Sequence, residues 1–153
     1  MEHRSTKTLE RVLVVCHGNV CRSPLAEAVI AKEIGRENVA SAGFGQEGLP
    51  VRKKIREYAA KHGLDLTDHR SVMATDEIFK QFNLVLYMDG GNLKRIPPGT
   101  RVQGLGEYIG LKRIADPAFQ PKGPATDKIL NQIVEASKRF SDGWHERNKR
   151  AAR

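Results

Sequence analysis

The two cysteines of the chain lie in one short segment, and an arginine directly follows the second. In "VLVVCHGNVCRSPLAEAVI" (12–30), Cys16 ends an apolar run, and Cys21 precedes Arg22. The apolar run is typical of a buried strand, and residues from about 24 to 33 have the spacing of a helix. The cysteines and the arginine are therefore expected in a loop that joins a strand to a helix.

This loop has the composition of an anion-binding site. Gly18 permits backbone angles that other residues resist, and Asn19 tolerates the left-handed region, so successive N–H groups can turn inward. Ser23 is a good N-cap and Pro24 suits the first helical turn, which directs the positive end of the helix to the same spot. Arg22 adds a guanidinium that can bind two phosphate oxygens. We therefore predict a site for a tetrahedral oxyanion.

Cys16 lies at the rim of this predicted site. Inward N–H groups, a helix N-terminus and Arg22 each favour a thiolate over a thiol. A thiolate that faces a bound phosphoryl group is a nucleophile positioned for in-line attack. Taken singly, a cysteine is more often a small buried hydrophobic residue, and a cysteine pair can be half of a metal site. The chain has no further cysteine to complete a thiolate-rich zinc site, and we expect neither a metal nor a cofactor.

Segments typical of strands and helices alternate along the rest of the chain. Alternation of this kind predicts an α/β domain with a parallel sheet covered by helices on both faces. Ligands of such sheets bind beyond the carboxyl ends of the strands, where Cys16 falls. Thr75 is expected to cap a short helix. The expected strands are 11–15, 38–43, 83–88 and 100–105, and the other expected helices are 51–62, part of 90–96 and a long one from about 125.

Length and composition indicate one globular domain over residues 1–153. Hydrophobic residues make up 39% of the chain and charged residues 29%, an ordinary balance for a folded protein. The net charge of +8 is concentrated in part at the ends, and we expect 1–10 and 145–153 to be flexible basic segments.

The same features limit the partners. Few aromatic residues and no recognisable motif argue against nucleic acid as the main partner. There is no long apolar run and no signal peptide, so we expect no membrane association, a cytoplasmic location and reduced cysteines. We also expect a monomer.

The segment around Cys16 resembles that of a known family. The stretch "VCHGNVCRSP" closely resembles the phosphate-binding loop of the low-molecular-weight protein tyrosine phosphatases. The resemblance extends over roughly residues 11–140, in family order. It continues through "SAG" (41–43), "HGLDLTDHR" (62–70), "LVLYMDGGNL" (84–93) and "DPAF" (116–119).

The resemblance implies a small doubly wound fold around a four-stranded parallel sheet, and hydrolysis of phosphotyrosine through a phosphocysteine without a metal. Cys16 matches the nucleophile, Arg22 the phosphate-binding arginine and Asp116 the general acid. Ser23 matches the hydroxyl that hydrogen-bonds the thiolate, and Cys21 the second cysteine that can pair with the nucleophile under oxidation. The residues expected around the phosphate are His17, Gly18, Asn19, Val20, Cys21, Arg22 and Ser23.

Further positions match supporting roles or depart from the family pattern. Asn19, Ser41 and His69 match a polar network that holds the loop in shape. The segment 44–50 is short and lacks tryptophan, a feature associated with the bacterial branch linked to exopolysaccharide systems. The resemblance thus implies a tyrosine-phosphorylated protein as partner, such as a bacterial tyrosine kinase of such a system. The expected walls of the substrate pocket are Phe44, Leu49 and Phe119.

Three other functions share parts of this pattern. Thioredoxin-coupled arsenate reductases share the loop but use additional cysteines, which this chain lacks. Protein-arginine phosphatases have a threonine at the position of Val20, whose methyl groups are better suited to an aromatic ring. A non-catalytic phosphate-binding module would most simply have lost Cys16, Arg22 or Asp116, and all three are present.

Overall fold

The computed structural model describes residues 9–151. Its centre is a four-stranded parallel sheet with the strand order β2-β1-β3-β4. The chain winds outward from β1 to one edge and then, through β3, to the other, so the direction of winding changes between β1 and β3. The predicted fold class is confirmed. The strands are β1 (Val12–Cys16), β2 (Val39–Gly43), β3 (Leu84–Tyr87) and β4 (Val102–Gly104).

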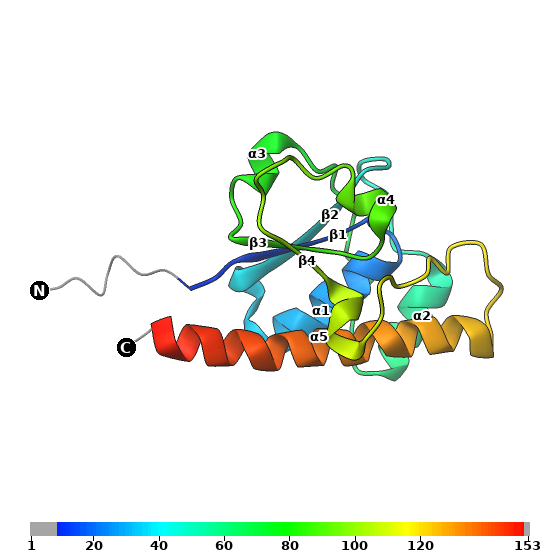
Figure 1. Cartoon of the computed structure of the whole chain (residues 1–153). Helices are drawn as coiled ribbons and strands as arrows, with labels where there is room; N and C mark the ends of the chain where they lie inside the picture. Colours follow the sequence, from blue (N-terminus) through cyan, green and yellow to red (C-terminus); the bar gives the residue numbers. More distant parts are fainter. Residues whose placement is uncertain (1–8, 152–153) are drawn as a thin grey trace, which may run out of the picture.

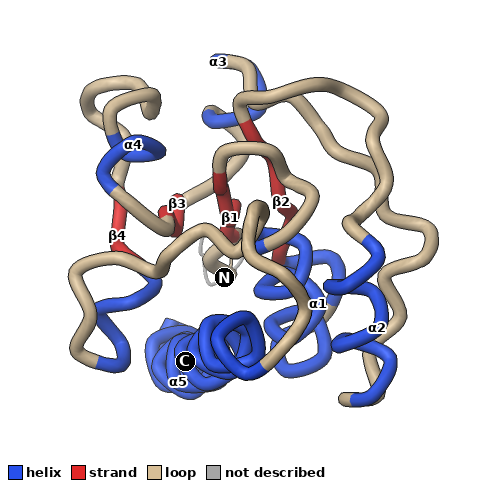
Figure 2. The backbone as a smooth tube through the Cα atoms, turned by 90° about the vertical axis from the view of Figure 1, so that its right-hand side faces the viewer, coloured by secondary structure: helices blue, strands red, loops and turns tan. Residues whose placement is uncertain are grey.

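Helices cover both faces of the sheet. Figure 2 shows α1, α2 and α5 on one side of the strands and α3 and α4 on the other. In Figure 1 the long helix α5 runs beneath the sheet along most of the molecule. The helices are α1 (Arg22–Ile34), η2 (Arg36–Asn38), α2 (Lys53–Lys61), α3 (Asp76–Phe79), α4 (Gly90–Leu93), η3 (Leu105–Ile109) and α5 (Pro124–Ala151).

Strand β1 is buried along its whole length, which explains its continuous apolar run. Val12 and Val14 belong to the larger core cluster, together with residues of α1 and α5. Leu13 and Val15 point to the other face and pack in a smaller cluster with Phe79 of α3. Because both faces of β1 are packed, the position of its carboxyl end, where Cys16 lies, is firmly defined.

The start of α1 differs from the prediction. Ser23 was expected as the N-cap, but the helix begins at Arg22, Cys21 is the capping residue, and no side chain caps the first turn. The Ser23 hydroxyl lies 3.0 Å from the sulfur of Cys16 instead. The N-cap prediction was wrong because the hydroxyl interacts with the cysteine and not with the helix backbone. By contrast, the Thr75 cap of α3 is confirmed by a hydrogen bond from Ile78 N.

The C-terminal segment also differs from the prediction. Residues 145–151, expected to be flexible, form the last part of α5. Trp144 Nε1 donates to the carbonyl of Glu10 at 2.8 Å, and Arg147 pairs with the Glu10 carboxylate at 2.7 Å. These contacts join the helix to the residues before β1. The rest of the expected flexible ends, 1–8 and 152–153, lies outside the described residues.

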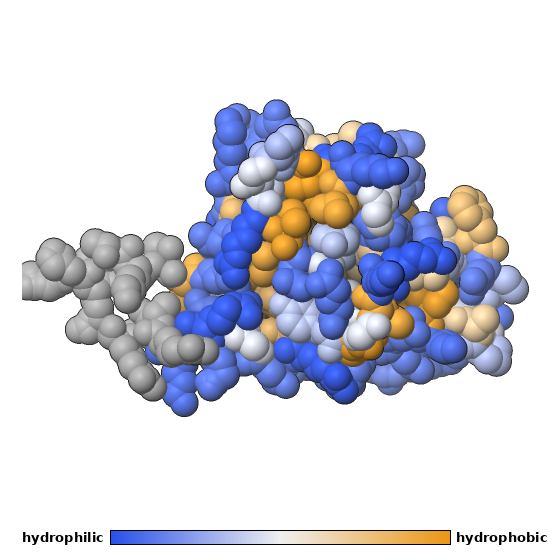
Figure 3. Space-filling view, viewed as in Figure 1, coloured by the Kyte–Doolittle hydropathy of each residue, from blue (hydrophilic) through white to orange (hydrophobic). Residues whose placement is uncertain are grey.

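The face of the molecule seen in Figure 3 is largely hydrophilic. Figure 3 shows charged and polar residues over most of one face, with separate hydrophobic areas, one of them above α5. Within residues 9–151, no helix combines the length and the apolar character that a membrane span needs.

Candidate active site

The segment from Cys16 to Arg22, the phosphate loop, curls back on the sulfur of Cys16. Asn19 adopts φ 56°, and no other non-glycine residue among those described has a positive φ. This turn brings the backbone N–H groups of Asn19 and Ser23 to 3.3 and 3.4 Å from the sulfur. With the Ser23 hydroxyl at 3.0 Å, the sulfur has three hydrogen-bonding partners.

Other backbone N–H groups of the phosphate loop are left free. Within residues 9–151, those of His17, Gly18, Val20 and Cys21 have no hydrogen-bond acceptor. A group of unpaired backbone N–H groups in one short turn is suited to bind an anion. This arrangement agrees with the anion site predicted from Gly18 and Asn19.

Arg22 is almost completely buried, at 1% exposed, and half of its guanidinium is already bonded. Its Nη1 donates to Asp89 Oδ2 and to the carbonyl of Ile114, both at 2.8 Å. Its Nε is buried without a partner among the described residues, and its Nη2 lies 3.6 Å from Asp116 Oδ2. Nε and Nη2 form one edge of the guanidinium fork, which is therefore available for two oxygens of an oxyanion.

Asp89 is a site residue to which the sequence assigned no role. It accepts from Arg22 and caps α4, where its side chain and that of Asn92 form reciprocal bonds. Burial raises the pKa of Asp89, but hydrogen bonds from Arg22 and from the Asn92 N–H outweigh it and hold the pKa below its usual value. A signal was present in the sequence, because Asp89 follows a buried strand whose carboxyl end lies beside that of β1.

Asn19 connects the phosphate loop to neighbouring segments. Its Nδ2 donates to the hydroxyls of Ser23 and Ser41, at 2.8 and 2.9 Å. Its Oδ1 accepts from Val72 N at 2.9 Å. The side chain is fully buried, so these bonds hold the left-handed turn in place. Asn19 and Ser41 are brought together as the resemblance implies.

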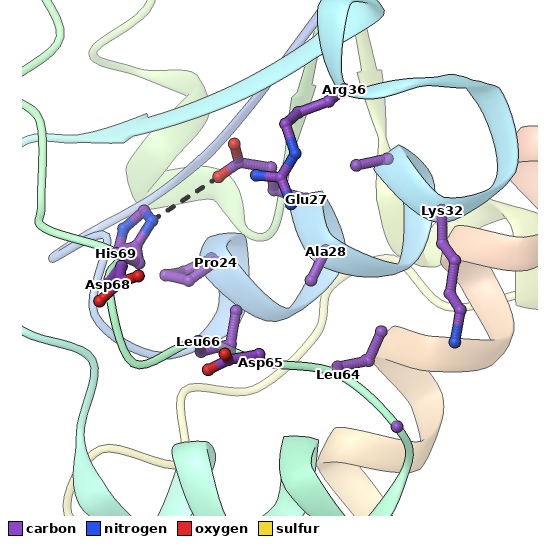
Figure 4. Close-up of a pocket in the computed structure, with 12 residues that line it drawn as sticks. Pro24, Glu27, Ala28, Lys32, Arg36, Leu64, Asp65, Leu66, Asp68 and His69 are labelled. Carbon is purple, nitrogen blue, oxygen red and sulfur yellow. Dashed lines mark ion pairs between the residues drawn. The ribbon is translucent and has the colours of Figure 1, made fainter.

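His69 contacts the backbone of the same loop. Its Nε2 lies 3.2 Å from the carbonyl of Asn19, and its Nδ1 lies 3.8 Å from Glu27 Oε1. Figure 4 shows this pair beside a cleft of about 450 Å³ between α1 and the segment 63–69. Glu27, which also accepts from the Ser41 hydroxyl, is a second residue that sequence reasoning missed. Neither Cys16 nor Asp116 lines this cleft.

Gly43 explains the "SAG" stretch in physical terms. A Cβ atom at this position would lie 2.8 Å from Asn19 N and 3.0 Å from the carbonyl oxygen of Cys16. Both neighbours are backbone atoms, which cannot move without displacing the phosphate loop. Only glycine lets the end of β2 approach the loop so closely.

Cys21 is buried, at 3% exposed, and both cysteines are free thiols in the structure. Burial first, and then the nearby Cys16, raise the pKa of Cys21 to about 12. Cys21 therefore remains protonated at neutral pH.

Asp116 lies in the segment 114–120, the acid loop, which is neither helix nor strand. Its side chain is 40% exposed, and one carboxylate oxygen accepts from Ala118 N at 2.9 Å. The other oxygen lies 3.6 Å from Arg22 Nη2. The structure thus brings together Cys16, Arg22 and Asp116, which are up to 100 residues apart in the chain.

The three expected pocket walls lie in different environments. Phe44 is half-buried and stacks on Phe79, with 6.4 Å between ring centroids. Leu49 is 36% exposed, and Phe119 is 92% exposed with the Arg52 guanidinium 6.0 Å from its ring centroid. The role of Phe44, Leu49 and Phe119 in the pocket stays a prediction.

Comparison with known proteins identifies a family that agrees with this geometry. The family model of "Low molecular weight phosphotyrosine protein phosphatase" matches residues 11–151. The chain belongs to this family. Its relatives include the probable low molecular weight protein-tyrosine-phosphatase EpsP of Ralstonia nicotianae, 37% identical over 89% of this chain and 94% of that protein. The rat low molecular weight phosphotyrosine protein phosphatase is 37% identical over 88% of this chain and 95% of that protein.

Solved structures agree with the family assignment. Wzb of Vibrio vulnificus in complex with benzylphosphonate superposes with a TM-score of 0.81 and 32% identity, covering 89% of this chain and 99% of Wzb. The Drosophila arginine phosphatase DARP has a TM-score of 0.76 and 31% identity, covering 88% of this chain and 97% of DARP. The family predicted from the sequence is therefore confirmed, and bacterial members are among these relatives.

Proposed function

We propose that this member of the family hydrolyses phosphotyrosine in protein substrates through a phosphocysteine formed on Cys16. The observation that carries the proposal is the free edge of the Arg22 guanidinium beside a loop of unpaired N–H groups, with the sulfur on one side and Asp116 on the other. Both an oxyanion site and the two groups needed for displacement are thereby present.

In the first step, the Cys16 thiolate attacks phosphorus, an S–P bond forms and the P–O bond to the tyrosine ring breaks. The loop N–H groups and the Nε–Nη2 edge of Arg22 bind the three non-bridging oxygens. The departing phenolate is a poor leaving group unless it is protonated, so the Asp116 carboxyl transfers its proton to the phenolic oxygen. Tyrosine leaves, and the phosphoryl group remains on sulfur.

In the second step, the Asp116 carboxylate accepts a proton from water as the water oxygen attacks phosphorus. The S–P bond breaks and its electron pair returns to sulfur, where the Ser23 hydroxyl at 3.0 Å can donate to the departing thiolate. Inorganic phosphate leaves, and Asp116 is protonated again. The reaction uses these side chains and water, with no other reactant.

The substrate and its location follow from the same chemistry. Cys16 must stay reduced to react, which suits the cytoplasm. The short segment 44–50 without tryptophan favours, as physiological substrate, a bacterial tyrosine kinase of an exopolysaccharide system.

Hydrolysis of phosphoarginine is the second candidate, and the similarity to an arginine phosphatase favours it. The side chain of Val20 argues for phosphotyrosine. It is half-buried, packs against the core and offers only methyl groups to a substrate. A hydroxyl at this position would be needed to recognise a guanidinium by hydrogen bonding.

Phosphate release from three matched peptides tests the proposal. The peptides carry phosphotyrosine, phosphoarginine or phosphoserine in the same sequence, and Cys16→Ser serves as the inactive control. We expect the phosphotyrosine peptide to have a kcat/KM at least about 100-fold above the other two. A preference for phosphoarginine would support the second candidate, and no phosphate release from any peptide would reject both.

A further inference from the structure

Lys54, the second residue of α2, is the main contact between that helix and the acid loop. Its ammonium donates to the carbonyl oxygens of Pro117, Ala118 and Gln120, the contact to Ala118 measuring 3.2 Å. A lysine ammonium has three N–H donors, so all of them have an acceptor here. The three carbonyls belong to the turn that directly follows Asp116.

The acid loop has few other hydrogen bonds. Within the described residues, its beginning is bonded to Arg22, at Ile114 and Asp116, and to the carbonyl of Met88, which accepts from Ile114 N at 2.8 Å. Ala115 and Ala118 also pack against the core. The bond from Gln120 N to the Pro117 carbonyl lies inside the loop. The exposed ring of Phe119 contacts the Arg52 guanidinium, 6.0 Å from the ring centroid. Without the Lys54 ammonium, the backbone after Asp116 would have no hydrogen bond to another described element until the carbonyl of Pro121, which accepts from Thr126.

Helix α2 is itself fixed to the phosphate loop. Arg52 N, directly before the helix, donates to the carbonyl of Val20 at 3.0 Å, and Ile55 is fully buried in the core. Lys54 lies between these two anchors. A rigid connection therefore runs from the phosphate loop through the first turn of α2 to the loop that carries Asp116.

We infer that Lys54 is a positioning residue for proton transfer, which holds the acid loop so that the Asp116 carboxyl faces the leaving group. This inference rests on the proposed phosphatase function. It assigns Lys54 no contact with the substrate, since its three donors are used by the loop. A displacement of a catalytic group by about 1 Å can cost on the order of 100-fold in rate, so a tether of this kind has a measurable effect.

A different explanation is that Lys54 acts through its charge. The charges of Lys54 and Arg52 act to lower the pKa of Cys21, although burial has the larger effect and the pKa is raised overall. Lys53 provides a matched control because it is adjacent, carries the same charge and is exposed, with no hydrogen bond or ion pair to the described residues. A general electrostatic effect would appear in both lysines, whereas a tether would appear in Lys54 alone.

The test compares Lys54→Met with Lys53→Met on two esters. Phenyl phosphate needs protonation of its leaving group, and 2,4-dinitrophenyl phosphate does not. We expect Lys54→Met to lower kcat/KM, which reports the first step and not the phosphocysteine hydrolysis that both esters share, about 10- to 100-fold with phenyl phosphate and less than about 3-fold with the dinitrophenyl ester. Lys53→Met should change neither by more than about 2-fold. An equal loss with both esters in Lys54→Met, or the same pattern in Lys53→Met, would overturn the inference.

A double-mutant cycle with Asp116→Asn gives the second measurement. If Lys54 acts through Asp116, Lys54→Met should have almost no further effect once the acid is absent. Full additivity of the two losses would contradict the inference. Lys54→Arg, which keeps the charge and several donors, should recover part of the lost rate and covers the case that Lys54→Met unfolds. A wild-type protein that hydrolyses neither ester would reject the proposed function itself, which is a distinct outcome.

Discussion

The phosphate loop and the acid loop meet at Arg22 but differ in how they are held. Cys16 and Asn19 are 2% and 0% exposed, and their bonds stay within the loop or reach adjoining buried segments. The Asp116 side chain is 40% exposed, and its loop depends on Arg22 and Lys54 from elsewhere in the chain. The residues that bind the oxyanion are therefore buried in the core, whereas the residue that transfers protons lies on a surface loop that is held by side chains from elsewhere.

This difference predicts that changes in the two loops have different consequences. A change at the sulfur should remove the reaction and spare binding. A change in the acid loop should lower kcat/KM only for substrates whose leaving group needs a proton, and it should slow hydrolysis of the phosphocysteine for all substrates.

The largest effect is expected for Cys16→Ser. It should lower turnover by more than about 10⁴-fold, because only the sulfur attacks phosphorus. Binding of vanadate should remain in part, because the N–H groups and Arg22 are unchanged. Turnover is measured with a phosphotyrosine peptide and binding by calorimetry. Near wild-type turnover in this variant would contradict the role of the sulfur as nucleophile.

Asp116→Asn should lower kcat/KM for phenyl phosphate by about 10²- to 10⁴-fold, the usual effect of losing a positioned acid. The loss in kcat/KM should shrink for esters with very acidic leaving groups, so a plot of log kcat/KM against leaving-group pKa should steepen. An equal loss of kcat/KM with all esters would mean that another residue is the acid.

Asp89→Asn should act mainly on stability. The pKa of Asp89 is lower in the folded protein than in the unfolded chain, where it is about 3.9. The charged form therefore stabilises the fold fully above about pH 3.9, and this stability is lost as the pH falls through the pKa of the folded state. We expect the variant to lose about 1 to 3 kcal/mol of unfolding free energy at neutral pH, because Arg22 loses a charged partner.

Urea unfolding at neutral pH and at about pH 3 measures this effect, and the difference from wild type should be smaller at the lower pH. Asp68→Asn, a change at an exposed carboxylate with no ion pair among the described residues, is the control. A difference that is the same at both pH values would contradict the Arg22–Asp89 explanation.

The smallest effect on basal turnover is expected for Cys21→Ser, because the backbone N–H of Cys21 rather than its side chain faces the oxyanion. Peroxide should oxidise the Cys16 thiolate to a sulfenic acid, and the Cys21 thiol should condense with it to a disulfide and water. A reductant then restores the wild type. In Cys21→Ser, peroxide damage should be largely unrecoverable, and mass spectrometry should detect no disulfide in the peptide that holds both positions. Full recovery of activity in the variant after peroxide and reductant would mean that Cys21 has only a packing role.

The sequence predicted the phosphate loop well because its determinants are local. Gly18, Asn19 and Arg22 lie within a few residues of Cys16, and the burial of β1 follows from its apolar run. The Ser23 cap was mispredicted because one hydroxyl suits two partners, and only the folded loop shows that the sulfur lies within reach. Asp116 was assigned by resemblance alone, since an Asp-Pro pair by itself is more often a turn.

Residues that act across elements could not be assigned in this way. Lys54 and Glu27 look like ordinary charged positions on helix surfaces, and their partners come from distant segments. The basic segment 145–151 looked like a solvated end, yet its helix is anchored by Trp144 and Arg147 on Glu10. Composition indicates which residues can be exposed, and tertiary contacts decide which are.

The central claim is that the phosphoryl group passes through the sulfur of Cys16 while Asp116 moves the protons. The most direct measurement mixes Asp116→Asn with a phosphotyrosine peptide, quenches within the first turnover in denaturant at alkaline pH, where S–P and N–P bonds persist, and maps the phosphoryl group by mass spectrometry. We predict that it lies on the peptide that contains Cys16, attached to that sulfur, and that it disappears as phosphate is released. Phosphate release without any phosphorylated Cys16, or a phosphoryl group on His17 instead, would contradict the account.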